Sequence, residues 1–148
     1  MLYQLLHILH KIIPAEALYA HCDIPCGIYT PEPALTAAKT VVKMVEKIKA
    51  LPQDMPPTDE TRNSFVRMVA VKEEHAQLCK KELLILWTDY FKPEHLEMFP
   101  DLHDTFWKAA KLCSKNKQGV STEAAQELLK AVEGIADIFH KAESAKVK

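Results

Sequence analysis

The residues best suited to chemistry lie together in the short segment HCDIPCG at residues 21–27. It places one imidazole (His21) and two thiols (Cys22 and Cys26) beside a proline and a glycine that favour a turn. Thiolates and imidazole bind zinc, copper, nickel and iron–sulfur clusters, and coordination geometry separates these metals better than ligand type does. Two simpler interpretations stay open. The thiols could form a disulfide, or the segment could be half of a zinc site, although no second Cys-x-x-Cys or His-x-x-x-His pair completes four ligands.

The segment before these residues is apolar at first and ends in a small residue, Ala20, as a signal peptide does. However, His7, His10 and Lys11 interrupt the apolar stretch, and Leu18 stands where an export cleavage site needs a small residue. We therefore expect residues 1–20 to be a propeptide that a dedicated protease removes, and residues 21–33 to form a structured hook.

Composition and charge exclude several classes of function. The 148 residues suffice for one autonomous core, and only 3 are glycine, which favours helix over sheet. A formal net charge of -1 provides no basic surface for nucleic acid. No run of about 18 apolar residues exists, so we expect no stable membrane insertion.

Apolar residues recur at helical spacing in four stretches. Short segments rich in proline or glycine separate these stretches. The stretches run from Ala34 to about Leu51, from a Thr58 cap to Tyr90, from Leu102 to about Asn116, and from a Ser121 cap into a lysine-rich tail. In the second stretch, the residues that fall on one face at steps of three and four are Phe65, Met68, Val69, His75, Leu78, Glu82, Ile85 and Leu86. The pattern predicts an all-α protein: an antiparallel four-helix bundle over residues 34–148, with the hook at its N-terminus.

Two further cysteines, Cys79 and Cys113, fall inside these helical patterns, each next to a leucine. A free cysteine in such a position usually behaves as a small buried hydrophobe. We expect both to lie in the core and not to take part in chemistry.

The segment HCDIPCGIY closely resembles the N-terminal hook of nickel-containing superoxide dismutases, and VKEEHAQL at 71–78 and LWTDYFKPEHLEMFPDLH at 86–103 extend the resemblance. The resemblance implies a homohexamer of four-helix bundles that disproportionates superoxide to O2 and H2O2 by cycling one nickel per subunit between Ni(II) and Ni(III). It also implies that cleavage exposes His21. The implied ligands are the His21 amine, the backbone nitrogen of Cys22 and the thiolates of Cys22 and Cys26, with the His21 imidazole as the axial ligand of Ni(III).

The same resemblance assigns roles to four residues around the metal. Tyr29 and Tyr90 match the family's two tyrosines that crowd the open face of the metal and hold water there. Asp23 and Lys92 match residues near the access channel, where a lysine would attract an anionic substrate. Without the resemblance, a buried tyrosine with one satisfied hydroxyl and a solvated lysine would be the simpler interpretations.

At one point the sequence departs from the family pattern. Family members hold the axial histidine with an arginine that is paired with a glutamate, and here His75 and Ala37 occupy those positions. Replacing both partners is physically coherent, because loss of the glutamate alone would leave a guanidinium unpaired. His75 could still orient the His21 imidazole from outside the ligand set, or it could be an ordinary helix histidine.

Two rival functions use the same residues differently. A nickel-storage or nickel-delivery protein would bind the metal without turnover and tolerate the N-terminal extension, whereas a helical interaction domain would hold Cys22 and Cys26 as a disulfide. The enzyme hypothesis also implies a processing protease and leaves room for a nickel chaperone as partners. We expect the protein to act in the cytoplasm, because residues 1–20 make a poor export signal, although they do not exclude export.

Overall fold

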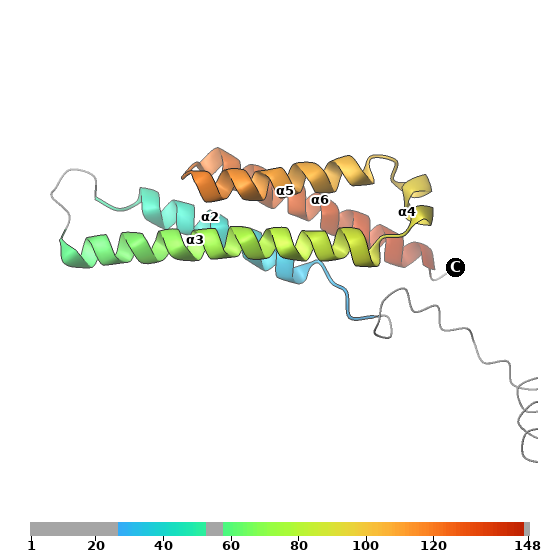
Figure 1. The fold of residues 1–148 in the computed structure, drawn as a ribbon, viewed down its shortest axis with the longest axis horizontal. Helices are drawn as coiled ribbons and strands as arrows, with labels where there is room; N and C mark the ends of the chain where they lie inside the picture. Colours follow the sequence, from blue (N-terminus) through green and yellow to red (C-terminus); the bar gives the residue numbers. More distant parts are fainter. Residues whose placement is uncertain (1–26, 53–57, 147–148) are drawn as a thin grey trace, which may run out of the picture.

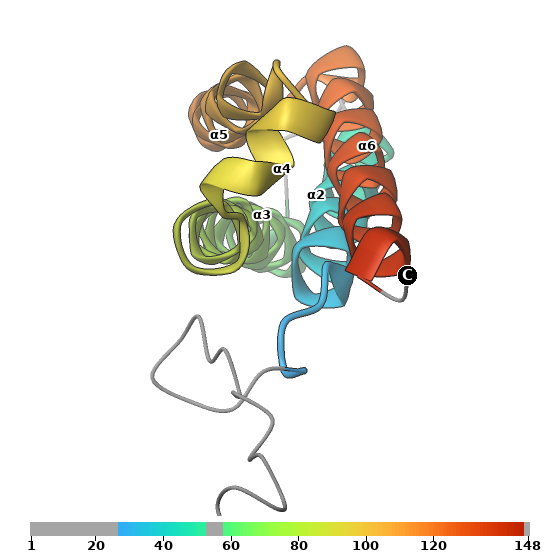
Figure 2. The ribbon, with the colours of Figure 1, turned by 90° about the vertical axis from the view of Figure 1, so that its right-hand side faces the viewer.

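The computed structural model describes residues 27–52 and 58–146, which form helices joined by short connections. In chain order these are α2 (Glu32–Lys49), α3 (Asp59–Ile85), the π-helical turn η1 (Leu86–Tyr90), α4 (Pro93–Met98), α5 (Leu102–Gln118) and α6 (Thr122–Lys146). The four long helices run side by side, and α2 and α5 each contact both α3 and α6 (Figure 1). Viewed from one end they surround a common core (Figure 2). The predicted four-helix bundle is confirmed.

The core consists largely of the residues that the helical periodicity indicated. All six apolar residues predicted to face inward from the first helix are buried in α2: Ala34, Ala37, Ala38, Val41, Val45 and Ile48. In α6 the buried residues include Leu128, Val132, Ile135, Ala136 and Phe139. Burial of these side chains is the main favourable term in folding, at about 1.5 to 3 kcal/mol for each large one.

The two internal cysteines are buried as expected, with no exposed surface on either Cys79 or Cys113. Cys79 on α3 and Cys113 on α5 lie at the same height along the bundle. The next residue on each helix shows this alignment, since Lys80 Nζ donates to Ser114 Oγ at 3.2 Å. The hydrogen bond with Cys113 and the loss of solvation raise the pKa of the Cys79 thiol. A thiol that stays protonated is a poor nucleophile and a poor metal ligand, so this cysteine acts as a core residue.

The prediction of which α3 residues face the core was partly wrong. Phe65 and Leu78 are 45% and 39% exposed, whereas the buried residues within α3 are Lys72, Ala76, Cys79 and Leu83. The buried Lys72 ammonium donates to the carbonyls of Asn116 and Lys117 at the end of α5. The first turns of α3 therefore extend past the end of α5, as Figure 1 shows, and no α5 residue lines the surface pocket beside Phe65.

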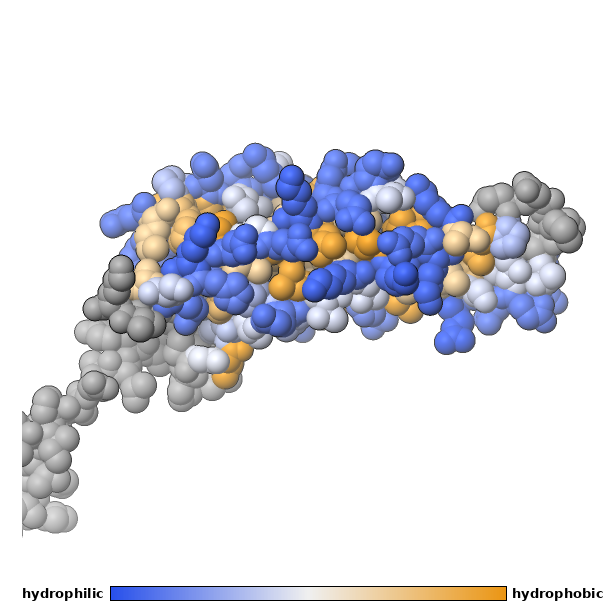
Figure 3. All heavy atoms as spheres, turned by 180° about the vertical axis from the view of Figure 1, so that it is seen from behind, coloured by the Kyte–Doolittle hydropathy of each residue, from blue (hydrophilic) through white to orange (hydrophobic). Residues whose placement is uncertain are grey.

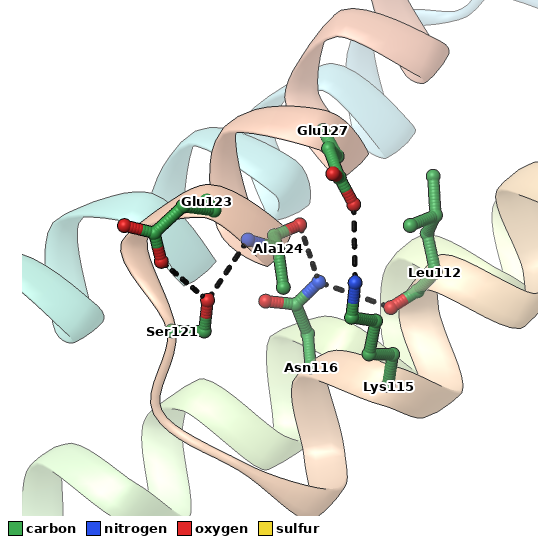
Figure 4. Close-up of polar contacts among 7 residues, drawn as sticks. All are labelled: Leu112, Lys115, Asn116, Ser121, Glu123, Ala124 and Glu127. Atoms are coloured by element: carbon green, nitrogen blue, oxygen red, sulfur yellow. Dashed lines mark hydrogen bonds and ion pairs between the residues drawn. The ribbon is translucent and has the colours of Figure 1, made fainter.

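The turn between α5 and α6 is held by side chains that satisfy backbone groups at the helix ends (Figure 4). Ser121 Oγ accepts from the backbone N–H of Ala124 at 3.1 Å and donates to Glu123 Oε2 at 2.7 Å. Asn116 Nδ2 donates to the carbonyl of Leu112 at 3.0 Å and to that of Ala124 at 2.9 Å. These bonds set the direction in which α6 leaves the turn, and therefore where its far end lies.

Ser121→Ala should lower the free energy of unfolding by about 1 kcal/mol, because the cap of α6 is lost. The backbone N–H of Glu123, the Ser121 hydroxyl and the nearby Lys49 lower the pKa of the Glu123 carboxyl. A carboxylate whose pKa is lowered by folding stabilises the protein above its ordinary pKa and loses that contribution as pH falls through the lowered value. The difference in free energy of unfolding between the parent and Ser121→Ala proteins, measured in urea, should therefore shrink as the pH falls below the ordinary pKa of a glutamate. Ser144→Ala near the other end of α6, where the hydroxyl only donates to the carbonyl of His140, should change little.

A short helix occupies the segment PEHLEMFP, which the sequence predicted only as a connector. Pro93 takes the first position of α4, where its missing N–H costs no hydrogen bond, and Lys92 before it is extended. In Figure 2, α4 lies across the end of the bundle where α3 ends and α5 begins.

The outside of the bundle is mainly polar. The face opposite to that of Figure 1 is covered largely by hydrophilic residues, with apolar atoms visible in a band along the bundle (Figure 3). Among residues 27–52 and 58–146, no helix is both long and apolar enough to cross a membrane.

Candidate metal centre

Two of the predicted site residues, Tyr29 and Tyr90, come together at one end of the bundle. Tyr29 lies in the segment just before α2, and Tyr90 is the last residue of η1. Their ring centroids are 6.1 Å apart and the rings are inclined at 68°, an edge-to-face contact. The start of α2 and the ends of α3 and α6 all lie at this end of the bundle, with α4 across it (Figure 2).

Tyr90 is held by aromatic neighbours on several elements. Phe139 of α6 lies 4.5 Å away between ring centroids, Phe91 meets the ring edge-on at 4.8 Å, and His95 of α4 stacks on it at 5.8 Å with an interplanar angle of 7°. The side chain is 1% exposed. A tyrosine packed in this way has one rotamer available, so its hydroxyl position is determined by the fold.

The Tyr90 hydroxyl donates a hydrogen bond to Glu143 Oε1 on α6. Both residues line a small cavity of about 130 Å³ whose other walls are Gly27, Tyr29 and Phe139. Gly27 has a φ of 120°, a backbone conformation that residues other than glycine rarely adopt. The chain therefore turns at this cavity directly after Cys26.

His75 and Lys92 do not line this cavity. Fifteen positions separate His75 from Tyr90, roughly 22 Å along a helix at 1.5 Å per residue. The His75 Nδ1–H donates to the carbonyl of Val71 at 2.9 Å, so Nε2 is its acceptor nitrogen. Lys92 is half-buried at the start of α4, and its backbone N–H donates to His95 Nδ1 at 2.9 Å.

The predicted ligands His21, Cys22 and Cys26, together with Asp23 and the predicted propeptide 1–20, lie outside the described residues. Within the part of the chain that the structure does describe, no group of three or more His, Cys, Asp or Glu side chains could hold a metal ion. The donor types of residues 21–26 suit nickel, because thiolate and imidazole are among the ligands that this metal accepts. Gly27 connects that segment to the cavity between the tyrosines.

Sequence reasoning missed Glu143 and His95. We expected the last helix to dissolve into a lysine-rich tail, but α6 continues to Lys146 and places Glu143 one turn after Phe139. That i, i+4 spacing was the available signal, since side chains four residues apart share one face of a helix. For His95 the sequence held no signal beyond its place in a segment that resembles the family.

Residues 16–143 match the model of the family described as nickel-containing superoxide dismutase. The chain belongs to this family. It is 35% identical to the superoxide dismutase [Ni] of Streptomyces seoulensis over 132 residues, which is 89% of this chain and 95% of that protein. The corresponding protein of Streptomyces coelicolor is 33% identical over the same shares of the two chains.

Solved structures of nickel-containing superoxide dismutase share the fold. Crystal structures of the oxidised state and of a state after partial X-ray-induced reduction each match with a TM-score of 0.73 and 34% identity. Each match covers 84% of this chain and 99% of the other chain. A structure of the apo form of nickel superoxide dismutase matches with a TM-score of 0.70, 30% identity and 80% of this chain covered.

Proposed function

We propose that this family member is an enzyme that disproportionates superoxide to O2 and H2O2 with a nickel ion held by His21, Cys22 and Cys26. The observation that carries the proposal is the small cavity between Tyr29 and Tyr90, which the chain enters at Gly27 immediately after these donors. Family membership over residues 16–143 favours turnover over nickel storage or delivery.

The donor set of residues 21–26 fits nickel in a specific way. The α-amine and the imidazole of His21, the backbone nitrogen of Cys22 and the thiolates of Cys22 and Cys26 would hold the ion. When bound, the nickel supplies one-electron redox chemistry between Ni(II) and Ni(III), which the strong amide and thiolate donors make accessible. His21 can offer an amine only if residues 1–20 are removed.

The remaining site residues would control what reaches the metal. A cavity of about 130 Å³ has room for only a few water-sized molecules, given that one water occupies about 30 Å³ in the liquid. A diatomic anion such as superoxide would fit. Tyr29 and Tyr90 would hold water there, while Lys92 would attract the anion and Asp23 would lie near the access channel. By its position in the family pattern His75 would orient the His21 imidazole through Nε2, which would require the hook to reach well beyond the cavity, since His75 lies roughly 22 Å along the helix from Tyr90.

Four further features belong to the same proposal. Residues 1–20 are a propeptide removed by a processing protease, and a nickel chaperone could supply the metal. Mature subunits assemble as a homohexamer of bundles, and the protein acts in the cytoplasm. Their support is the resemblance at the hook, together with a segment 1–20 that makes a poor export signal.

The test compares the full chain with a version that begins at His21, both reconstituted anaerobically with Ni(II). We expect one nickel per subunit and superoxide dismutase activity only in the His21 version, measured by metal analysis and by the decay of superoxide absorbance. Nickel bound in both versions without activity would refute the enzyme and leave a metal carrier. A Cys22–Cys26 disulfide with no bound nickel in thiol counting would leave an interaction domain.

A further inference from the structure

Glu143 connects the interior of the site to its outer edge. Its carboxylate accepts the hydrogen bond from the Tyr90 hydroxyl, and both side chains line the cavity. Tyr90 is 1% exposed, whereas Glu143 is half-buried, so the carboxylate is the more solvent-accessible of the two partners. The contact joins residues 53 positions apart in the sequence and exists only because α6 returns to the end of α3.

Superoxide disproportionation consumes protons as well as electrons. Two superoxide ions and two protons give one O2 and one H2O2, so two protons must enter the cavity in each cycle. A single buried tyrosine can give one proton and must then recover it. The recovery requires a group that exchanges protons with solvent and that touches the tyrosine oxygen.

We propose that Glu143 is this group, a proton-relay residue that acts through Tyr90; the inference rests on the proposed function. In the structure the Tyr90 hydroxyl donates to the carboxylate. When Glu143 takes a proton from solvent, the hydrogen bond reverses and its O–H donates to the tyrosine oxygen. Tyr90 then passes its own proton to the reduced dioxygen in the cavity and receives the Glu143 proton, so that Glu143 returns to the carboxylate and Tyr90 stays neutral.

Two features favour Glu143 in this role. Its half-buried carboxylate lies at the edge of the cavity, where it can exchange protons with solvent. Its partner is fixed by packing between Phe139 and His95, so the two oxygens stay within hydrogen-bond reach. A positioned proton donor of this kind typically contributes about 10²- to 10⁴-fold to a rate.

Other titratable groups near Tyr90 are less well placed. His95 stacks with its ring parallel to that of Tyr90, and its Nδ1 accepts from the backbone N–H of Lys92, so its proton is on Nε2. Tyr29 meets Tyr90 edge-to-face. His140, one turn before Glu143 on α6, packs on Phe139 at 5.6 Å between ring centroids. Of these groups, Glu143 is the carboxylate that accepts from the hydroxyl itself.

The test uses Glu143→Gln in the nickel-loaded His21 version, since glutamine keeps the shape and an acceptor but cannot carry the proton. We expect the turnover number to fall by about 10²- to 10⁴-fold at unchanged nickel content, the range for losing a positioned proton donor. The solvent deuterium isotope effect should rise, because proton delivery becomes rate-limiting. In Glu143→Ala, small carboxylic acids such as formic acid should restore turnover in proportion to their concentration.

Glu133→Gln is the matched control, because Glu133 is exposed on the same helix away from the cavity, and it should behave as the parent does. A Glu143→Gln protein with parental turnover and isotope effect would overturn the relay. So would a loss of activity that only follows a loss of nickel. If the parent His21 version itself shows no activity, the proposed function fails, and that result is distinct from the failure of the relay alone.

Discussion

Replacing Cys22 or Cys26 with serine in the His21 version should abolish both nickel binding and superoxide disproportionation. A serine hydroxyl stays protonated at neutral pH and is a poor ligand for nickel, so each change would remove one of the proposed thiolate donors. Activity should drop to the background of unbound metal, a loss of many orders of magnitude for a reaction that depends wholly on the metal. Metal analysis and superoxide decay measure the two effects separately.

The core cysteines provide the control for this experiment. Cys79 and Cys113 have no exposed surface, and replacing either by alanine should cost some stability but leave one nickel per subunit. If a Cys22 variant kept its nickel while a Cys79 variant lost it, the ligands would have to lie within the bundle and the hook assignment would be wrong.

Phe106→Ala should cause the largest loss of stability among single changes near the site. The side chain is 1% exposed and lies against Trp87 at 5.9 Å and Phe91 at 5.4 Å between ring centroids. Removing a buried phenylalanine costs about 3 to 5 kcal/mol, because transfer free energy is lost and a cavity is left. Urea unfolding of the His21 version should show that decrease.

The neighbouring Trp107 is the matched control, because it is 53% exposed on the outer face of the same helix. Trp107→Ala should lower the free energy of unfolding by less than about 1 kcal/mol. Phe106 also touches Phe91, which packs edge-on against Tyr90, so Phe106→Ala should weaken the support of the site. Equal effects of the two changes would mean that α5 does not pack as the structure describes.

The sequence was enough to predict the architecture because the determining signals are local. Alanine and branched apolar residues at steps of three and four predicted the buried face of α2 residue by residue. The Thr58 cap is present, with its side chain accepting from the backbone N–H of Thr61, and the helical run from α3 through η1 ends at Tyr90, before Pro93. Helix boundaries depend on capping and on proline geometry, both of which can be recognised from a few adjacent residues.

The inner face of α3 was less predictable for a physical reason. Phe65 and Leu78 both fit a helical stripe, but whether Phe65 is buried depends on where the partner helices end. Since α5 ends beside Lys72, the first turns of α3 have partners on fewer sides, and a lysine can be buried where it satisfies the last carbonyls of α5. Burial of this kind is a property of the assembled bundle and leaves no local pattern.

The site too has a part that the sequence predicts and a part that only the fold decides. The sequence by itself determined the donor set of residues 21–26, because ligand types and their spacing lie within one short segment. Only the tertiary structure decided what surrounds Tyr90. The contacts with Phe139, His95 and Glu143 join the end of α3 to α4 and α6, and such long-range pairs form only when the chain has closed the bundle. A glutamate in a lysine-rich tail thus becomes the hydrogen-bond partner of a buried tyrosine.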